Sequence, residues 1–124
     1  MFLSPLDVVL TNCDIVEPDL LYFSNDRAGQ IVTPQNLRGA PELVVEIASP
    51  GTRRRDETIK RRLYERAGVS EYWIVDPDVD VVRAYRREPE AFGRAIKLTR
   101  ERGDVLATPL LPGLDIPLSR IFRE

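Results

Sequence analysis

Residues 41–76 read PELVVEIASPGTRRRDETIKRRLYERAGVSEYWIVD, which predicts a strand, a helix and a second strand in succession. Pro41 to Ala48 is strongly apolar without clean alternation, as is typical of a central strand covered on both faces. Ser49-Pro50-Gly51 predicts a tight turn after this strand. Glu71 to Asp76 is rich in aromatic and β-branched residues and predicts the second strand, which ends at a turn formed by Asp76-Pro77.

The segment between these two strands carries the signals of one helix. Thr52 is the expected N-cap, the helix is expected to run to about Ala67, and Gly68 stands where a C′ glycine belongs. Spacing by four predicts an apolar stripe that faces the core and, about 100° around the helix, a polar stripe that borders it. The two stripes are Ile59, Leu63 and Ala67, and Asp56, Lys60 and Tyr64.

The flanking sequence completes a mixed pattern. Further strands are expected at residues 6–10, 15–23, 79–86 and 94–100, and the third of these is expected to form a hairpin with residues 71–76. Residues 24–39 are polar and predict a loop, and residues 110–114 predict a bend before a short C-terminal segment. This order predicts an α/β (α+β) fold in which a helix packs on one mixed β-sheet. The length predicts a single domain over residues 1–124.

Composition narrows the possible chemistry. The chain of 124 residues is 43% apolar, has a formal net charge of −2 and contains no histidine. The missing histidine excludes Ser-His-Asp hydrolysis, Cys-His hydrolysis and histidine-ligated metal sites. The single cysteine, Cys13, excludes an internal disulfide and a cysteine-rich zinc site. A metal ion would therefore need oxygen ligands, which favours Mg²⁺ or Mn²⁺. Because no secretory signal and no membrane-spanning tract is found, a cytoplasmic location is expected.

Two carboxylates interrupt apolar runs and are the first candidates for a site. Asp19 and Glu46 lie on strands expected to be neighbours, and an acid on a buried strand needs a partner. Lys60 of the helix could bring an amine to them, and such a group can hold a divalent cation and activate water. Periodicity alone favours the alternative that Lys60 extends along the apolar stripe into water.

The helix also concentrates positive charge. Residues 53–66 include seven basic and three acidic residues, and the rest of the chain is correspondingly acidic. A local basic patch on an acidic protein can bind a phosphate backbone. Charge alone favours the alternative of a solvated helix face with pairs such as Glu57 with Arg61.

Several motifs in a fixed order carry a family resemblance. They are Pro18-Asp19-Leu20-Leu21, residues 39–56 (GAPELVVEIASPGTRRRD), Lys60, residues 63–69 (LYERAGV), residues 71–77 (EYWIVDP) and the bend at residues 111–114. From about Pro5 onward, the chain resembles the bacterial Uma-two family of restriction-endonuclease-like proteins, which belongs to the PD-(D/E)XK nuclease superfamily. The resemblance implies a restriction-endonuclease-like fold and a Mg²⁺-dependent nuclease that hydrolyses phosphodiester bonds of nucleic acid, with DNA as the expected substrate.

The same resemblance implies roles for single residues. Asp19 and Glu46 would ligate Mg²⁺ (or Mn²⁺), and the backbone carbonyl of Ile47 would complete the protein's share of the ligands. Ala48 stands where the family pattern expects a lysine, two places after Glu46. Lys60 is therefore the displaced amine, which would stabilise hydroxide or the charge that develops on the phosphorus centre.

Further residues are expected around this site. Three neighbouring side chains are expected to contact the metal ligands or Lys60 and hold them in position: Glu17, Asp56 and Tyr64. The helix is expected to start with Arg53, Arg54 and Arg55, which could bind a phosphate group. For each of these arginines, a solvated role is an equal alternative.

Family members usually carry an additional helix and hairpin at the N-terminus, so this region is expected to be reduced here. A sheet face left less covered would associate, which predicts a homodimer or larger homo-oligomer. Three functional classes stay open: a Mg²⁺-dependent nuclease, a non-catalytic binding module that keeps the nuclease fold, and a regulatory dimer without nucleic acid. The acids and the lysine favour the first class, whereas the acidic net charge and the reduced N-terminus favour the other two.

Overall fold

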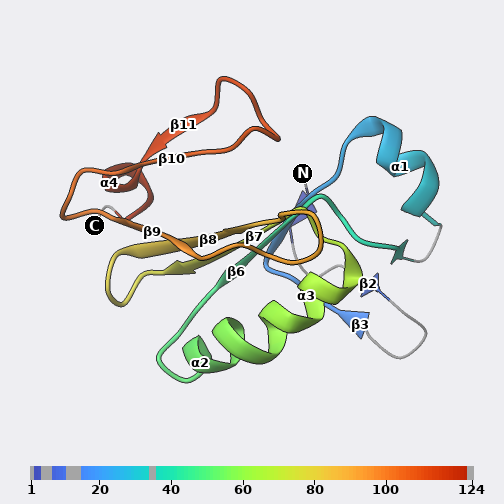
Figure 1. The fold of residues 1–124 in the computed structure, drawn as a ribbon, viewed down its shortest axis with the longest axis horizontal. Coiled ribbons are helices and arrows are strands. Elements are labelled where there is room, and N and C mark those ends of the chain that lie inside the picture. Colours follow the sequence, from blue (N-terminus) through green and yellow to red (C-terminus); the bar gives the residue numbers. More distant parts are fainter. Residues whose placement is uncertain (1, 4–6, 11–14, 34–35, 123–124) are drawn as a thin grey trace.

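The computed structural model describes residues 2–3, 7–10, 15–33 and 36–122. A six-stranded mixed sheet organises these residues (Figure 1). Strands β6 and β7 are parallel, and every other neighbouring pair in this sheet is antiparallel. In spatial order the strands are β1 (Phe2–Leu3), β4 (Leu20–Tyr22), β6 (Leu43–Ile47), β7 (Glu71–Asp76), β8 (Val81–Arg86) and β9 (Ile96–Thr99).

Smaller elements flank this sheet. A three-stranded sheet of order β3-β2-β5 lies near the N-terminus, and a two-stranded sheet lies near the C-terminus. The bounds of these strands are β2 (Val8–Val9), β3 (Ile15–Val16), β5 (Leu37–Arg38), β10 (Val105–Ala107) and β11 (Asp115–Pro117). Two short helices accompany them, α1 (Asn25–Ile31) and α4 (Leu118–Ile121).

The sheet has a packing layer on each face, as Figure 1 shows: the central helix on one side and the C-terminal elements on the other. On the helix side the core cluster comprises Ala40, Val44, Ala48, Tyr64, Val69, Tyr72, Ile74 and Phe92. On the opposite side it comprises Leu43, Val45, Trp73, Val82, Ala84, Leu106, Leu118 and Phe122. The expectation of a sheet face left less covered is therefore wrong for the described part of the chain, because β10 and α4 bury it. This removes the physical argument on which the expected homo-oligomer rested.

The predicted connection between β6 and β7 is confirmed as one helical rod with an irregular middle. It consists of α2 (Arg53–Arg55), a π turn η1 (Asp56–Lys60) and α3 (Arg61–Ala67). Gly68 ends the rod with φ 90°, a left-handed conformation that glycine adopts without steric cost. Thr52 is not the side-chain cap that the sequence predicted, because its hydroxyl instead accepts a hydrogen bond from Ser49 N at 2.9 Å.

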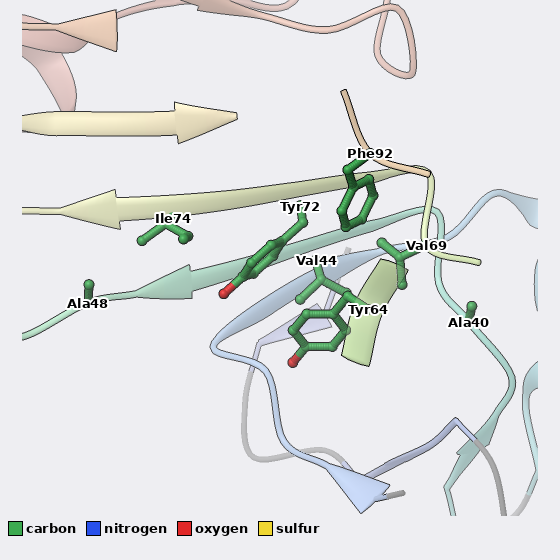
Figure 2. Close-up of a cluster of buried hydrophobic side chains, with 8 residues drawn as sticks. All are labelled: Ala40, Val44, Ala48, Tyr64, Val69, Tyr72, Ile74 and Phe92. Atoms are coloured by element: carbon green, nitrogen blue, oxygen red, sulfur yellow. The ribbon is translucent and has the colours of Figure 1, made fainter. Parts of the chain in front are cut away.

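The helix presents a different face to the sheet than its apolar stripe predicted. Ile59 is 64% exposed, whereas Asp56 and Tyr64 are 1% and 0% exposed. Figure 2 shows the reason: the Tyr64 ring of the helix lies beside the Tyr72 ring of β7, with both hydroxyls directed to the same side. Their centroids are 4.9 Å apart. Burying two aromatic rings outweighs burying one isoleucine, and the extra residue in the π turn shifts the phase of the residues before it.

The helix α1 falls where the sequence predicted a loop. Its residues Asn25, Asp26 and Gly29 have weak helix propensity, and the local signal for a helix is Ser24, whose side chain caps the N-terminus by accepting from Arg27 N at 3.2 Å. Tertiary contacts supply what propensity does not: Ile31 is buried, and Arg27 Nε donates to the Ala40 carbonyl at 3.0 Å. The strand expected at residues 15–23 is likewise divided into β3 and β4. The predicted hairpin of β7 and β8 is confirmed, as is the fold class.

Candidate active site

Glu46 is a buried acid on the central strand β6, and its side chain points to the helix. It is 3% exposed. Its Oε2 atom accepts a hydrogen bond from the Tyr64 hydroxyl at 2.7 Å and lies 3.2 Å from Lys60 Nζ. Two groups four residues apart on the helix therefore meet one carboxylate oxygen, because the polar stripe of the helix faces the sheet.

Lys60 lies between two carboxylates. Its Nζ atom is also 3.4 Å from Oδ1 of Asp56, which is buried in the same π turn. The backbone carbonyl of Asp56 accepts from the Tyr72 hydroxyl at 3.0 Å, which fixes the turn against the sheet. Burial alone would lower the pKa of Lys60, but the charges of Glu46 and Asp56 together raise it above 10.5. The ammonium therefore stays protonated at neutral pH.

Asp19 reaches this group from β4, the strand beside β6. Its Oδ2 atom accepts a hydrogen bond from Ile47 N at 2.7 Å, and its own N–H donates to Glu46 Oε1 at 3.4 Å. The aspartate thus lies at the end of both strands, next to the buried glutamate. Asp19 and Lys60 thus both contact Glu46, at its two different oxygens, which brings together the three residues that the family resemblance implied.

The electrostatics of Glu46 reflect competing neighbours. Burial raises its pKa above 4.5, while the hydrogen bond from Tyr64 and the charge of Lys60 lower it. The nearby Asp19 carboxylate raises the pKa further. The net direction is upward, so this acid holds its proton more tightly than an exposed glutamate. A cation placed between the two acids would oppose both of the effects that raise the pKa.

The donor set fits a hard divalent cation. Within the described residues, no cluster of three or more histidine, cysteine, aspartate or glutamate side chains has the geometry of a metal site. Two carboxylates and a backbone carbonyl are nevertheless enough for Mg²⁺, which usually keeps several water ligands. In the described part of the chain, Asp19 Oδ1 accepts no hydrogen bond, and Glu46 Oε1 accepts only the long one from Asp19. Each acid therefore keeps an oxygen for such an ion.

Of the predicted supporting residues, the structure places Asp56 and Tyr64 against the site but leaves Glu17 aside. Glu17 is exposed, and none of the contacts that join Asp19, Glu46 and Lys60 includes it. It immediately precedes buried Pro18 and lies between β3 and β4, outside both strands, so no strand directs its side chain toward the site.

The arginines at the start of the helix are not equivalent. Arg53 Nε lies 2.5 Å from Asp76 Oδ2, and Arg53 Nη2 lies 3.1 Å from Asp78 Oδ2. Arg53 is therefore held by protein carboxylates, whereas Arg54 and Arg55 are exposed. The expected pair of Glu57 with Arg61 is wrong, because Glu57 Oε1 instead lies 3.3 Å from Arg83 Nη1 on β8.

Asp76 is the contact that sequence reasoning missed. The sequence predicts a turn residue here, and Asp76 Oδ1 does accept from Asp78 N at 3.2 Å, but the side chain is also 0% exposed and ties the start of the helix to the end of β7 through Arg53. The signal was an acid at the end of a buried strand combined with an arginine at the start of the preceding helix.

The chain matches a family model and is similar in fold to a solved structure. A model of the family Uma2, described as putative restriction endonucleases, matches residues 1–119. Among solved structures, the chain is similar to a putative nuclease of DUF820 from Anabaena variabilis ATCC 29413, with a TM-score of 0.77 and 21% sequence identity. The match covers 98% of this chain and 66% of that one, and at this identity it shows a shared fold. No curated protein matches. In the described residues, no helix has the length and apolarity needed to cross a membrane.

Proposed function

This chain belongs to the Uma2 family, and from that membership and the site geometry we propose that it is a nuclease. The proposed reaction is hydrolysis of a phosphodiester bond in nucleic acid, DNA first, with Mg²⁺ or Mn²⁺ as cofactor. The observation that carries the proposal is that Lys60 Nζ lies 3.2 Å from Glu46 Oε2, while the Asp19 N–H contacts the other oxygen of the same carboxylate.

Lys60 acts as a fixed positive charge. The pKa of Lys60 is raised, so the ammonium does not serve as a general base near neutral pH. Its role is to stabilise the negative charge that develops on the phosphoryl oxygens as the attacking oxygen approaches. Asp56 provides a second carboxylate contact to this ammonium, 3.4 Å from Lys60 Nζ, which limits how far Lys60 can move.

Asp19 and Glu46 hold the cofactor. When bound, Mg²⁺ supplies Lewis-acid polarisation of the phosphoryl group and a lowered pKa for water. The Tyr64 hydroxyl orients Glu46 by donating to Oε2, which leaves Oε1 on the side of Asp19. The Ile47 N–H orients Asp19 in the same way. Both acids are thus held by the neighbouring backbone or helix before any ligand arrives.

The test is cleavage of plasmid and single-stranded DNA with Mg²⁺, with Mn²⁺ and with EDTA. Wild-type protein is compared with Asp19→Ala, Glu46→Ala and the control Asp115→Ala, which removes an exposed acid on β11. The proposal expects cleavage that depends on the metal, is lost in the first two variants and is kept in the control. Activity that survives both site substitutions would contradict it.

A non-catalytic module with the nuclease fold is the second candidate. The observation that favours it is that Glu46 Oε2 is already engaged by both Tyr64 and Lys60, which a degenerate site would keep for stability. Mn²⁺ binding followed by calorimetry separates the two functions. Binding lost in Asp19→Ala without cleavage of any nucleic acid would support the module, and cleavage would exclude it.

A further inference from the structure

We propose that the outer side of the helical rod, which faces away from the sheet, binds phosphate groups along the nucleic-acid backbone. The proposal rests on the proposed function for the identity of the ligand. It concerns a surface separate from the group formed by Asp19, Glu46 and Lys60, and it assigns the rod a second role as the part that grips the substrate.

A shallow groove of about 720 Å³ runs along this side of the rod. Its lining is mostly arginine, and its one acid, Glu65, lies 3.8 Å from Arg61. We call this surface the arginine face, defined by Arg54, Thr58, Ile59, Arg61, Arg62 and Arg66. The π turn contributes to it, because the extra residue per turn changes the phase between Arg54, which precedes the turn, and the arginines that follow it.

Three cations on the arginine face have no protein partner. Among the described residues, no ion pair includes Arg54, Arg62 or Arg66, and all three are exposed. Of the other basic groups of the rod, Arg53 is engaged by Asp76 and Lys60 by Glu46, whereas Arg55 is exposed, has no ion pair among the described residues and does not line the groove. The structure therefore sorts the positive charge of this segment into an inner set that holds the fold and site and an outer set that is free.

Arg61 lies at the edge of the arginine face, next to β8, and is held in place. Its Nε atom donates to the Glu57 carbonyl at 3.1 Å, and its guanidinium lies 5.8 Å from the centroid of the Tyr85 ring. An arginine that is already ordered loses less side-chain entropy when it binds an anion. It would provide a fixed point between the unpaired guanidinium groups of Arg54 and Arg66 at the two ends of the face.

The length of the arginine face suits a polymer rather than a single anion. Residues 54–66 span about 18 Å at roughly 1.5 Å per residue, which is the axial length of about five base pairs. Ile59 is 64% exposed in the middle of these cations. A free phosphate gains nothing from an exposed isoleucine, whereas the sugar of a nucleic-acid backbone can pack against it.

A larger groove on the same molecule is less suited to this ligand. It measures about 750 Å³ and lies over β8 and β9. Its arginines are paired with protein acids: Arg53 with Asp76, Arg83 with Glu57 and Arg100 with Asp80. Breaking such pairs would oppose the gain from phosphate, so size alone does not identify the binding surface.

The experiment measures binding of a labelled DNA duplex by fluorescence anisotropy, in EDTA so that no cleavage occurs, across a series of NaCl concentrations. The variant replaces three free arginines: Arg54→Gln, Arg62→Gln and Arg66→Gln. The control removes the same charge elsewhere by substituting three other exposed basic residues: Arg94→Gln, Lys97→Gln and Arg120→Gln. A third protein, Ile59→Ala, removes the apolar contact and keeps the charge.

The proposal expects the arginine variant to bind DNA at least roughly tenfold more weakly at about 50 mM salt, with a log–log salt slope shallower by about 2 to 3. The charge-matched control should bind like wild type, and Ile59→Ala should lose affinity about equally at every salt concentration. Equal weakening by both triple variants would overturn the proposal. So would binding of polyglutamate as tight as that of DNA, because the face would then accept any polyanion.

These outcomes are independent of catalysis. If the arginine variant binds normally while wild type cleaves DNA, the proposed function stands and the arginine face is wrong. If wild type binds through this face and cleaves nothing, the arginine face stands and the nuclease is wrong. Circular dichroism melts of all three proteins check that altered binding does not come from unfolding.

Discussion

Glu46 and Glu71 are both buried acids of the central sheet, but they lie on opposite faces and have different neighbours. Glu46 is 3% exposed and Glu71 is 4% exposed. Glu71 accepts from Trp73 Nε1 at 3.0 Å, from Arg86 Nε at 3.4 Å and from the Thr108 hydroxyl. Both of its oxygens are closed by donors. Glu46 instead meets Tyr64 and Lys60 at Oε2, whereas among the described residues Oε1 accepts only the long hydrogen bond from the Asp19 N–H, and the charge of the Asp19 carboxylate acts on Glu46 as well.

Burial of an acid does not by itself mark a functional site, as these two glutamates show. A fully satisfied carboxylate such as Glu71 joins β7 to the C-terminal hairpin and has no oxygen left for a ligand. A carboxylate with an acid on one side and an ammonium on the other is less satisfied, since two like charges approach each other. That residual unfavourable energy is what a cation would relieve.

The largest expected effect distinguishes the two glutamates by activity. Glu46→Gln should lower kcat/KM for DNA cleavage by on the order of 10³-fold, because the variant removes a charge at the reacting centre. Glu71→Gln should cleave at close to the wild-type rate at temperatures where it is folded. Initial rates of cleavage of a supercoiled plasmid measure the difference, and an equal loss of activity in both variants would contradict the prediction.

The second prediction concerns stability, where the substitution of Glu71 should have a larger effect than that of Glu46. Glu71→Gln should lower the free energy of unfolding by about 2 kcal/mol, because the new amide cannot accept from all three donors and places an NH₂ group among them. Glu46→Gln should change it by less, since losing the buried charge offsets the lost ion pair. Urea titrations without metal would compare them, and a larger loss for Glu46→Gln would contradict the prediction.

The third prediction concerns pH in the absence of metal. The pKa of Glu46 is raised above 4.5 by burial, so the folded protein binds this proton more tightly than the unfolded chain. Its contribution to the free energy of unfolding is therefore fully present below pH 4.5 and is lost as the pH rises through the raised pKa. Carboxyl carbon NMR of labelled protein would follow the titration. A midpoint for Glu46 at or below 4.5 would show that the ion pair outweighs burial.

The smallest expected effects come from a matched pair of hydroxyl deletions. Tyr64→Phe removes one donor from Glu46, and Thr108→Val removes one from Glu71. Each should cost about 1 kcal/mol of stability. Tyr64→Phe should also raise the pKa of Glu46 further and move the acidic limb of the pH–rate profile upward, because the lost hydrogen bond favoured the charged form. Thr108→Val should leave that limb unchanged.

Local sequence patterns predicted much of the fold, because several of its elements depend on a few consecutive residues. The apolar run of β6, the turn after it, the helix ended by Gly68 and the strand β7 all follow from short-range rules. The helix α1 was not predicted, because its Asn, Asp and Gly residues favour a loop; the Ser24 cap supports it locally, and a contact of Arg27 with Ala40 adds support from farther along the chain. The candidate site was predictable to the same extent, since the motifs named Asp19, Glu46 and Lys60 but not how they are held.

The amino-acid sequence alone limits the chemistry of the candidate site: without histidine, with acids in apolar runs and with Lys60 on the connecting helix, the site offers oxygen ligands and the ammonium of that lysine. Tertiary structure decided which groups meet. Packing of Tyr64 against Tyr72 turned the helix so that Asp56 and Lys60 face inward and Ile59 faces out. The tertiary structure also pairs Arg53 with Asp76, leaves Arg54 without an ion pair among the described residues, and brings the Thr108 hydroxyl, 37 residues away in sequence, to donate to Glu71. The physical reason is that side-chain partnerships depend on which surfaces bury the most area together, and periodicity along a single element carries no information about the opposing surface.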